Sequence, residues 1–340
     1  MKISFKNDYA EGAHPAILEA LVKTNLSQQA GYGLDVYSLR AKELIREKIG
    51  NPSASVYFVD GGTQANLLVI GALLRAYESV IAADTAHIAD SETGAIEAMG
   101  HKIHLCASVE GKISPKEIAD YATRYTNFPH QVKPRLVYIT NATEVGSIYR
   151  LSELKAIYEC CQAHQLLLFI DGARLGSALN AESNDIGWED LAKYSDIFYI
   201  GATKNGGLLG EAIVFNNPLL GEGFDYHLKQ KGALLAKGRL LGLQFKTLFE
   251  CNLYDSLARY ANECMRLIKE AFKAKGYGFL SDTDTNQLFP ILPNEVVSIL
   301  AKNFAFYEWK KIDEHHTAIR LICSWATTEE QVNTLIEAIP

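Results

Sequence analysis

An aspartate and a lysine follow two apolar runs that lie about one strand–helix unit apart in the sequence. The run LLLFI is followed by Asp171, and the run DIFYIG is followed three residues later by Lys204. Short apolar runs bounded by glycines are typical of buried parallel strands, and open α/β sheets bind ligands beyond the carboxyl ends of such strands. We therefore expect the Asp171 carboxylate and the Lys204 amine to face the same ligand.

An acid and an amine at such an edge can hold two ends of one cofactor. Pyridoxal 5'-phosphate (PLP) needs this pair, because a lysine forms its Schiff base and an aspartate keeps its pyridine nitrogen protonated. The glycines at 201, 206, 207 and 210 would let a ligand approach the backbone around Lys204. The alternatives are an ordinary Asp-Gly turn and a solvated lysine. Spacing alone does not identify the cofactor.

Two further segments could contribute to the same pocket. Gly62 and Thr63 follow an expected strand and open an expected helix. There the unpaired backbone N–H groups, the missing side chain and the hydroxyl would suit a phosphate, although an ordinary turn is the alternative. His87 follows another short strand. It could stack on a flat cofactor ring, although in isolation a structural histidine is the more common role.

Arginines are the candidates for binding a carboxylate. Arg320 lies inside the apolar run AIRLIC, where an unpaired charge is costly, so it needs either a substrate carboxylate or a structural acid. Arg174 is three residues from Asp171 and could reach the same pocket. The basic residues of 229–240, among them Lys231 and Arg239, form either a solvated helix face or a phosphate ligand that crosses a subunit interface.

The composition is that of a globular protein with a large core. The chain has 340 residues, is 48% hydrophobic and carries a net charge of −7. This charge argues against nucleic-acid binding through a basic surface. No apolar stretch approaches the ~20 residues of a membrane span, and the N-terminus has no signal-peptide apolar region. Six cysteines without a C-x-x-C pair predict reduced thiols and a cytoplasmic protein, and we expect no metal site.

Strands and helices alternate through the first two thirds of the chain. The expected strands are 55–59, 79–83, 102–106, 135–140, 166–170, 196–200 and 211–215. The expected helices between them are 63–77, 91–99, 115–126 and 152–164. This alternation predicts an α/β domain with a mostly parallel, seven-stranded sheet.

From about residue 225 the pattern changes. Two long helical stretches are expected over 225–250 and 252–275. Strand-like segments follow at 286–292, 303–309 and 317–323, and a last helix is expected near 328–338. We therefore expect a large domain over 15–245 and a smaller C-terminal α+β domain over 246–340.

Taken together, several segments resemble the threonine aldolases, in the aspartate-aminotransferase-like (type I) group of PLP enzymes. The segments span nearly the whole chain: NDYAEGAHPAIL (7–18), GYGLD (31–35), GGTQAN (61–66), AHIADSETGAIEAMGHKI (86–103), DGARLGSAL (171–179), GATKNGGLLGEAIVF (201–215), AKGRLLGLQF (236–245) and RLICSWATTEEQV (320–332). The resemblance implies the type I fold, PLP as cofactor and a homodimer or homotetramer with active sites at the subunit interface. It also implies that the N-terminal segment 1–14 contributes to the active site.

The resemblance implies a role for each candidate residue. Lys204 would form the Schiff base, and Asp171 would bind the pyridine nitrogen. The remaining cofactor contacts would come from a stacked histidine, the phosphate ligands and an arginine near the cofactor's O3′: His87, Gly62, Thr63, Thr203, Arg174 and Arg239, the last from a neighbouring subunit. Substrate contacts would come from Asn7, Arg174 and Arg320.

One stretch departs from the family pattern. Many threonine aldolases carry a histidine in an Asn-Thr-His stretch near the substrate hydroxyl, whereas this chain reads Asn141-Ala142-Thr143-Glu144. The group that takes the hydroxyl proton could therefore be His87, Glu144, Glu92 or a water.

Three functions follow from these residues. The favoured one is cleavage of L-threonine, L-allo-threonine or a related β-hydroxy-α-amino acid to glycine and an aldehyde. A PLP-dependent β-elimination or racemisation would use the same lysine and aspartate. A non-catalytic binding protein of the same fold is disfavoured, because a scaffold does not need Asp171, Arg174, Lys204 and Arg320 together.

Overall fold

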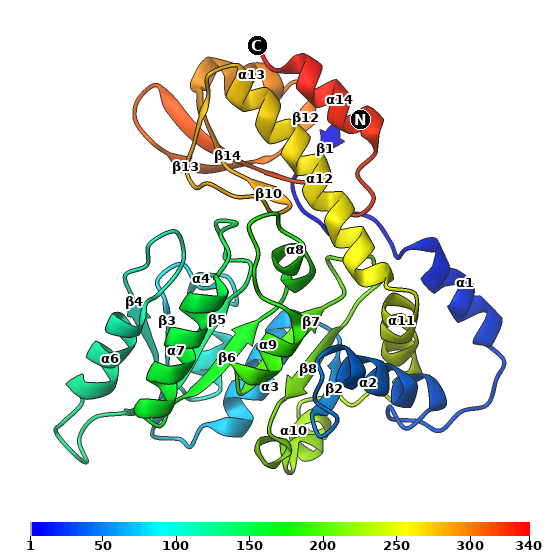
Figure 1. Ribbon diagram of the computed structural model, residues 1–340, viewed down its shortest axis with the longest axis vertical. Helices are drawn as coiled ribbons and strands as arrows, with labels where there is room; N and C mark the ends of the chain where they lie inside the picture. Colours follow the sequence, from blue (N-terminus) through cyan, green and yellow to red (C-terminus); the bar gives the residue numbers. More distant parts are fainter. Residues whose placement is uncertain (1) are drawn as a thin grey trace.

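A seven-stranded sheet forms the centre of the computed structural model, which describes residues 2–340 (Figure 1). Its strand order is β2-β8-β7-β6-β5-β3-β4. The strands are β2 (Ser55–Val59), β3 (Glu78–Ala83), β4 (Ile103–Cys106), β5 (Lys133–Thr140), β6 (Leu167–Asp171), β7 (Ile197–Gly201) and β8 (Glu211–Phe215). Only β8 runs antiparallel to its neighbours in this sheet. The prediction of a mostly parallel α/β sheet is confirmed.

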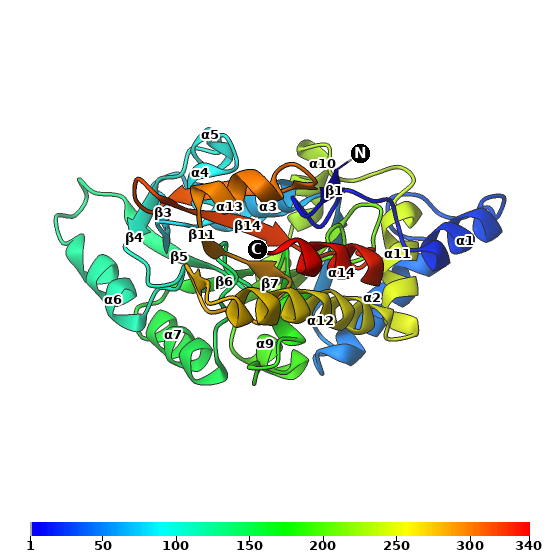
Figure 2. The same ribbon diagram turned by 90° about the horizontal axis from the view of Figure 1, so that it is seen from above.

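Helices cover both faces of this sheet, as its apolar strands require. Figure 2 shows α3, α4, α5 and α10 on one side and α6, α7 and α9 on the other. Their bounds are α3 (Gly62–Leu73), α4 (His87–Asp90), α5 (Ala95–Ala98), α6 (Pro115–Arg124), α7 (Leu151–Ala163), α8 (Leu175–Leu179), α9 (Trp188–Lys193) and α10 (Phe224–Gln230), with the 3₁₀ turn η1 at Pro218–Gly221.

Two of the expected helices are broken in the structure. Of the expected helix 91–99 only α5 is helical, because Thr93 and Gly94 both have positive φ angles, and the short α4 lies before this range. The expected helix 225–250 is divided into α10 and α11 (Arg239–Glu250), and Gly232 between them has a φ of +75°. Left-handed backbone of this kind cannot continue an α-helix.

The sequence pattern missed the elements nearest the N-terminus. The strand β1 (Ile3–Ser4) pairs with β12 (Phe304–Ala305), so the chain begins beside its own C-terminal third. The helices α1 (Pro15–Thr24) and α2 (Val36–Lys48) follow and contact α11. Residues 5–14 therefore cross from the C-terminal part of the molecule to the edge of the large sheet.

The C-terminal elements surround a second group of buried apolar side chains, which includes Phe5 from the N-terminal segment. These elements are α12 (Leu253–Ala274), β9 (Gly278–Phe279), β10 (Gln287–Leu288), β11 (Pro290–Pro293), α13 (Asn294–Leu300), β13 (Tyr307–Lys311), β14 (His316–Ile322) and α14 (Glu329–Ala338). The apolar cluster around the large sheet extends to Leu257 at the start of α12. The division of the chain at residue 245 stays a prediction.

Within residues 2–340, no helix combines the length and the apolar character that crossing a membrane would require.

Candidate active site

A cavity of about 300 Å³ opens at the carboxyl ends of the parallel strands. Eight of the predicted site residues line it: Gly62, Thr63, His87, Glu144, Asp171, Arg174, Thr203 and Lys204. Asn7, Arg239 and Arg320 do not line it. The fold therefore brings residues from five separate segments of the chain to one place.

Asp171 lies at the end of β6 and is only 1% exposed. Hydroxyl groups from the two flanking strands donate to its two oxygens: Tyr199 Oη to Oδ1 at 2.5 Å and Tyr138 Oη to Oδ2. The backbone N–H of Ala173 and the Asn66 amide complete the set, at 3.0 and 3.2 Å. Four donors thus fix the orientation of this buried carboxylate.

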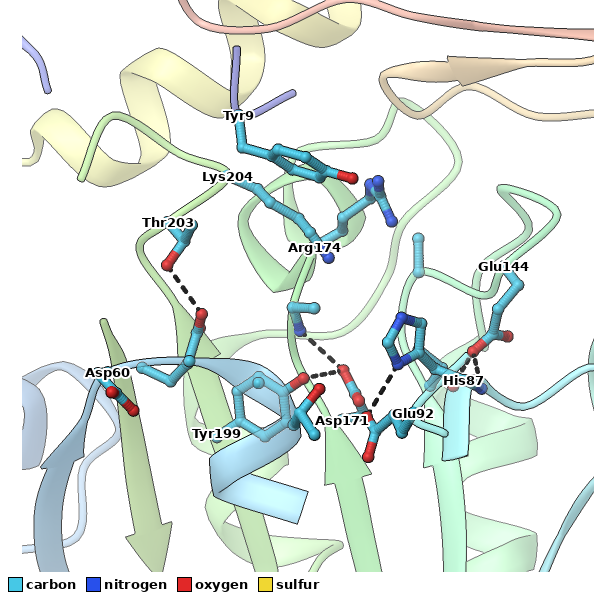
Figure 3. Close-up of a pocket in the computed structure, with 17 residues that line it drawn as sticks. Tyr9, Asp60, His87, Glu92, Glu144, Asp171, Arg174, Tyr199, Thr203 and Lys204 are labelled. Carbon is cyan, nitrogen blue, oxygen red and sulfur yellow. Dashed lines mark hydrogen bonds and ion pairs between the residues drawn. The ribbon is translucent and has the colours of Figure 1, made fainter. Parts of the chain in front are cut away.

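Lys204 lies in the turn after β7, close to Arg174 and beneath the ring of Tyr9 (Figure 3). Burial and the positive charge of Arg174 lower the pKa of the Lys204 amine, while Asp8, Asp171 and Glu211 act in the opposite direction. A lysine with a lowered pKa has a larger neutral, nucleophilic fraction.

The residue before it, Thr203, is hydrogen-bonded to the carboxyl of Glu211, which was not among the residues expected from the sequence. Thr203 Oγ1 donates to Glu211 Oε1 at 3.0 Å and accepts the N–H of Gly210 at 3.0 Å. Glu211 lies on β8 between Val59 and Gly201, and burial raises the pKa of its carboxyl. Its Oε2 is buried without a hydrogen-bond partner.

The start of α3 borders the same cavity. Gly61 precedes the helix with an extended backbone and no side-chain cap, so the first N–H groups of α3 are not satisfied by a capping side chain. A Cβ at Gly62 would lie 3.0 Å from Tyr199 Oη, so a side chain would crowd this position. A second, more open cavity reaches Gly61, Gly62 and Thr63 from outside, and Lys231 of the same chain lines it.

Two glutamates hold His87 from different sides. Glu144 Oε1 accepts the backbone N–H of His87 at 2.8 Å, and Glu92 Oε1 lies 2.9 Å from His87 Nδ1. Glu92 also accepts from Asn66 at 2.7 Å, and Asn66 donates to Asp171 as well. Hydrogen bonds through Glu92 and Asn66 therefore connect the His87 ring to the Asp171 carboxylate, and Figure 3 shows the first of them, between His87 and Glu92.

Arg174 makes a two-pronged ion pair with Asp8. Its Nε lies 2.8 Å from Asp8 Oδ2 and its Nη2 3.0 Å from Oδ1. Asn286, just before β10, donates to Asp8 Oδ2 at 2.9 Å. Burial alone would raise the pKa of Asp8, but Arg174 and Lys204 outweigh it and lower that pKa below 3.8. The N-terminal segment, the large sheet and the C-terminal elements thus meet at one carboxylate.

Arg320 has no such partner. Its Nε is buried without a hydrogen-bond acceptor, and within residues 2–340 no carboxylate forms an ion pair with its guanidinium. The group stacks instead over Trp309 and Tyr307, at 4.7 and 5.0 Å from the ring centres. Burial and the charge of Arg174 lower the pKa of Arg320. A structural acid is therefore not its partner in the part of the chain that the structure describes.

Like Arg320, the predicted residues Arg239 and Asn7 do not line the cavity, and both bond to backbone groups of the same chain. Arg239 donates to the backbone carbonyls of Thr24, at 2.5 Å, and of Ser27, at 2.7 Å, at the end of α1. Asn7 Oδ1 accepts the N–H of Tyr9 at 3.2 Å. A contact of Arg239 with a neighbouring subunit's phosphate, and of Asn7 with substrate, stay predictions.

Several residues of the site were missed from the sequence: Asp8, Tyr9, Asn66, Tyr138, Thr140, Tyr199 and Glu211. Tyr138 and Tyr199 had one usable signal, a polar-headed ring two residues before the end of a buried strand. Asn66 lies in the quoted GGTQAN segment, and Asp8 is adjacent to a predicted residue. Sequence alone gave no reason to place these groups at the Asp171 carboxylate or at Arg174.

Comparisons with known proteins agree with this geometry. Residues 5–294 match the family of the beta-eliminating lyases. The low-specificity L-threonine aldolase of Pseudomonas aeruginosa is 35% identical over 98% of this chain and 96% of its own length. A Leishmania major threonine aldolase structure has a TM-score of 0.97 at 42% identity and covers 99% of this chain and 98% of that one.

The class of fold is shown by a more distant structure. A Thermus thermophilus aspartate aminotransferase variant has a TM-score of 0.74 at 14% identity, over 99% of this chain and 90% of that one. The fold is therefore of the aspartate-aminotransferase type, as the resemblance implied. Within that class, the chain belongs to the beta-eliminating lyase family. Its relatives include a low-specificity L-threonine aldolase, in agreement with the resemblance seen in the sequence.

Proposed function

We propose that this protein is a PLP-dependent aldolase that cleaves L-threonine, L-allo-threonine or a related β-hydroxy-α-amino acid to glycine and an aldehyde. The observation that carries the proposal is the convergence of Asp171 and Lys204 on one cavity. Two relatives that match this chain over nearly its whole length are low-specificity L-threonine aldolases, and they support the choice of reaction.

The residues of the cavity fit PLP. The buried Asp171 carboxylate suits the pyridine nitrogen of that molecule, and the Lys204 amine, with its lowered pKa, suits the aldehyde. The start of α3, which has two glycines and no capping side chain, suits the phosphate. Asp171, Lys204 and the Gly62–Thr63 backbone would hold these three parts, with His87 beside the ring and Thr203 near the phosphate. Bound there, PLP would accept electrons from the bonds at the substrate Cα.

The chain's own groups would orient the amino acid. The free guanidinium of Arg320 is suited to the substrate carboxylate, because a planar fork binds a carboxylate with two hydrogen bonds. Arg174, fixed by Asp8, would present its remaining N–H groups to the same side of the cavity. Holding the carboxylate determines which Cα bond is aligned for cleavage. For an aldolase this is the Cα–Cβ bond.

We also propose that the protein is a cytoplasmic homo-oligomer. All six cysteines are free, which suits a reducing compartment. On α1 and the segment after it, Val22, Leu26, Leu34 and Val36 are between 59 and 92% exposed. Exposed apolar side chains gathered on one segment favour burial against another chain, here a second copy. Light scattering should then give at least a dimer, and Leu26→Asp should lower that mass.

An absorbance spectrum of the purified protein tests the function. A visible band that changes when L-threonine or L-allo-threonine is added, with aldehyde detected through a coupled alcohol dehydrogenase, is the expected result. The band together with 2-oxobutanoate and ammonia would support β-elimination, the activity in the family's name. The band with only the amino acid of inverted Cα configuration, D-allo-threonine from L-threonine, would support racemisation. Without a band, even after PLP is added, the cofactor assignment would be wrong.

A further inference from the structure

Cleavage of a β-hydroxy amino acid releases the proton of the β-hydroxyl, and this proton needs an acceptor on the cavity wall. The family's usual histidine is absent here, since Glu144 stands in that stretch. The wall that carries Glu144 also carries Thr140. These two side chains are hydrogen-bonded to each other.

Thr140 is the last residue of β5 and lies directly across from Asp171 in the parallel ladder. Both residues line the cavity. The Thr140 hydroxyl is therefore one strand away from the carboxylate that we assign to the pyridine nitrogen. It donates its hydrogen to Glu144 Oε1 at 2.9 Å. Its lone pairs are available to accept a second hydrogen from a group inside the cavity.

Glu144 is held in place by what it accepts. Its Oε1 takes both the Thr140 hydroxyl and the backbone N–H of His87, while Oε2 is buried without a partner. Figure 3 shows the carboxylate pointing toward His87 from the side of the cavity opposite Thr203. Burial raises the pKa of Glu144 to about 7, with Asp171 acting in the same direction. A general base works best when its pKa lies near the operating pH.

The other carboxyl on this wall is less suited to the task. The Glu92 side chain is fully buried, and its Oε1 is occupied by Asn66 and the His87 ring. No hydroxyl that lines the cavity donates to Glu92 in the part of the chain that the structure describes. Glu92 is thus arranged to orient His87, whereas Glu144 is connected to the cavity through a hydroxyl.

We propose that Thr140 and Glu144 form a proton relay for the β-hydroxyl of the substrate, with Thr140 as the contacting group and Glu144 as the acceptor behind it. The inference rests on the proposed aldolase function. It adds a catalytic residue, Thr140, and makes Glu144 the group that acts through it.

The relay balances in one concerted step. The substrate O–H bond breaks as its proton passes to Thr140 Oγ1, and the Oγ1 proton passes to Glu144 Oε1. The electron pair left on the substrate oxygen becomes the second bond of the aldehyde carbonyl. The Cα–Cβ pair remains with the glycine carbon. In the reverse direction Glu144 returns its proton through Thr140, so the same pair serves aldol addition.

The charged and titratable groups around Glu144 limit what else could produce its pH dependence. They are Asp171 on β6, Arg174 after β6, Tyr138 on β5, Tyr149 before α7 and His87 on α4. Burial raises the pKa values of Tyr138 and Tyr149 above 10, and arginine stays charged. His87, whose backbone N–H donates to Glu144, carries the remaining side chain here that can accept a proton. A test must therefore separate Glu144 from the His87 ring.

Steady-state kinetics of the PLP-loaded enzyme with L-threonine make the first test. In the wild type, kcat should rise with pH through about 7 and then level off, because the carboxylate form is the acceptor. Thr140→Val should lower kcat roughly 10²–10⁴-fold, the usual worth of general-base catalysis, with a smaller change in KM. Thr140→Ser restores the hydroxyl and should return most of the rate. Glu144→Gln keeps both accepted hydrogen bonds but should lose the rate and the rise near pH 7.

Glycine provides the matched control, because it lacks the β-hydroxyl. Exchange of its α-proton in D₂O needs the same lysine and cofactor but not the relay. This exchange should be close to wild type in Thr140→Val and Glu144→Gln. Loss of exchange in step with threonine cleavage would mean that the pair only supports the pocket, and would overturn the relay.

A second readout does not depend on turnover. The infrared C=O band of a protonated carboxyl should disappear in the wild-type protein with a midpoint near pH 7, and this change should be missing in Glu144→Gln. Glu211, whose pKa is also raised, should titrate in both proteins and serves as the internal reference. An unchanged kcat in Thr140→Val, or a rise near pH 7 that persists in Glu144→Gln, would overturn the relay and point to His87. A wild type that binds PLP but releases no aldehyde would instead refute the proposed function, and the relay with it.

Discussion

The two sides of the cavity are built in different ways. In the floor, at the ends of β5 to β8, Asp171 accepts hydrogen bonds from four donors, which come from β5, β7, the turn after β6 and helix α3. The roof is formed by residues 5–14, whose Tyr9 lines the cavity, and by β14. Arg320 on β14 does not line the cavity and has no carboxylate partner among residues 2–340. A fully bonded floor suits a group that stays, such as a cofactor. An unpaired cation in the roof suits a group that comes and goes, such as a substrate.

The two arginines, Arg174 and Arg320, differ in the same way, since only Arg174 is paired with a carboxylate. Arg174 is already neutralised, because Asp8 accepts from two of its nitrogens. Arg320 keeps its charge over two aromatic rings. Proteins rarely bury an unpaired charge, because its desolvation is not offset. The free-energy cost of leaving the Arg320 charge unpaired is therefore better explained by a role in ligand binding than by a contribution to folding stability.

Removing the floor's amine should have the largest effect. Lys204→Ala should abolish aldehyde formation and the visible PLP band, because no other amine among residues 2–340 lines the cavity. The free energy of unfolding should change little, because keeping a charged lysine amine buried is itself costly, as its lowered pKa indicates. Coupled-enzyme assays and circular dichroism measure the two quantities. A variant that retained full activity would move the active site away from this cavity.

Breaking the pair that joins roof and floor should come next. Arg174→Met leaves Asp8 buried without its cation, and removing one partner of a buried pair typically costs about 3–5 kcal/mol. The urea midpoint should fall accordingly. The double variant Asp8→Asn with Arg174→Met should recover part of the loss, because it removes the stranded charge. No recovery in the double variant would mean that the loss comes from packing and not from charge.

The floor could be predicted from the sequence more fully than the roof. Asp171 and Lys204 lie at the ends of strands that apolar runs mark clearly, so local pattern and general sheet geometry suffice. The short strand β1 and its pairing with β12 have no local signal, since two residues make no pattern. Without β1 the path of residues 5–14 is unknown, and so is the meeting of Asp8 with Arg174.

Partners were harder to predict than positions. The sequence marked Arg320 as needing an acid, but whether a structural acid lies within reach depends on contacts between distant elements. It also suggested Arg239 as a ligand of a neighbouring subunit's phosphate, which stays a prediction. Within one chain the Arg239 guanidinium bonds the end of α1, and Lys231 lines the same outer cavity as Gly62. Such choices depend on tertiary packing, which no window of local sequence contains.

Substitution of the unpaired Arg320 tests its role directly. Arg320→Met should weaken substrate binding by about 1.5–3 kcal/mol, the usual worth of hydrogen bonds to a charged group. Its stability should be unchanged or slightly higher, because a methionine can still pack on Trp309 and Tyr307 without a buried charge. The measurements are KM for L-threonine and the urea midpoint. A stability loss as large as that of Arg174→Met would show that Arg320 has a structural partner after all.

The smallest expected effect concerns acid. The folded-state pKa of Asp8 is lowered below 3.8, because Arg174 and Lys204 outweigh its burial. A carboxylate of this kind contributes stability above its unfolded pKa, and loses that contribution as pH falls through the folded one. Asp8→Asn should therefore be less stable than wild type at neutral pH. The difference should narrow as pH falls below 3.8, because Asp8 of the unfolded chain then takes up a proton while folded Asp8 stays charged. It should level off below the folded pKa. Urea midpoints of both proteins across this range measure it. A gap that stayed constant into acid would mean that the roof is held to Arg174 by shape and hydrogen bonds alone, and the contrast between the two arginines would then lose its electrostatic basis.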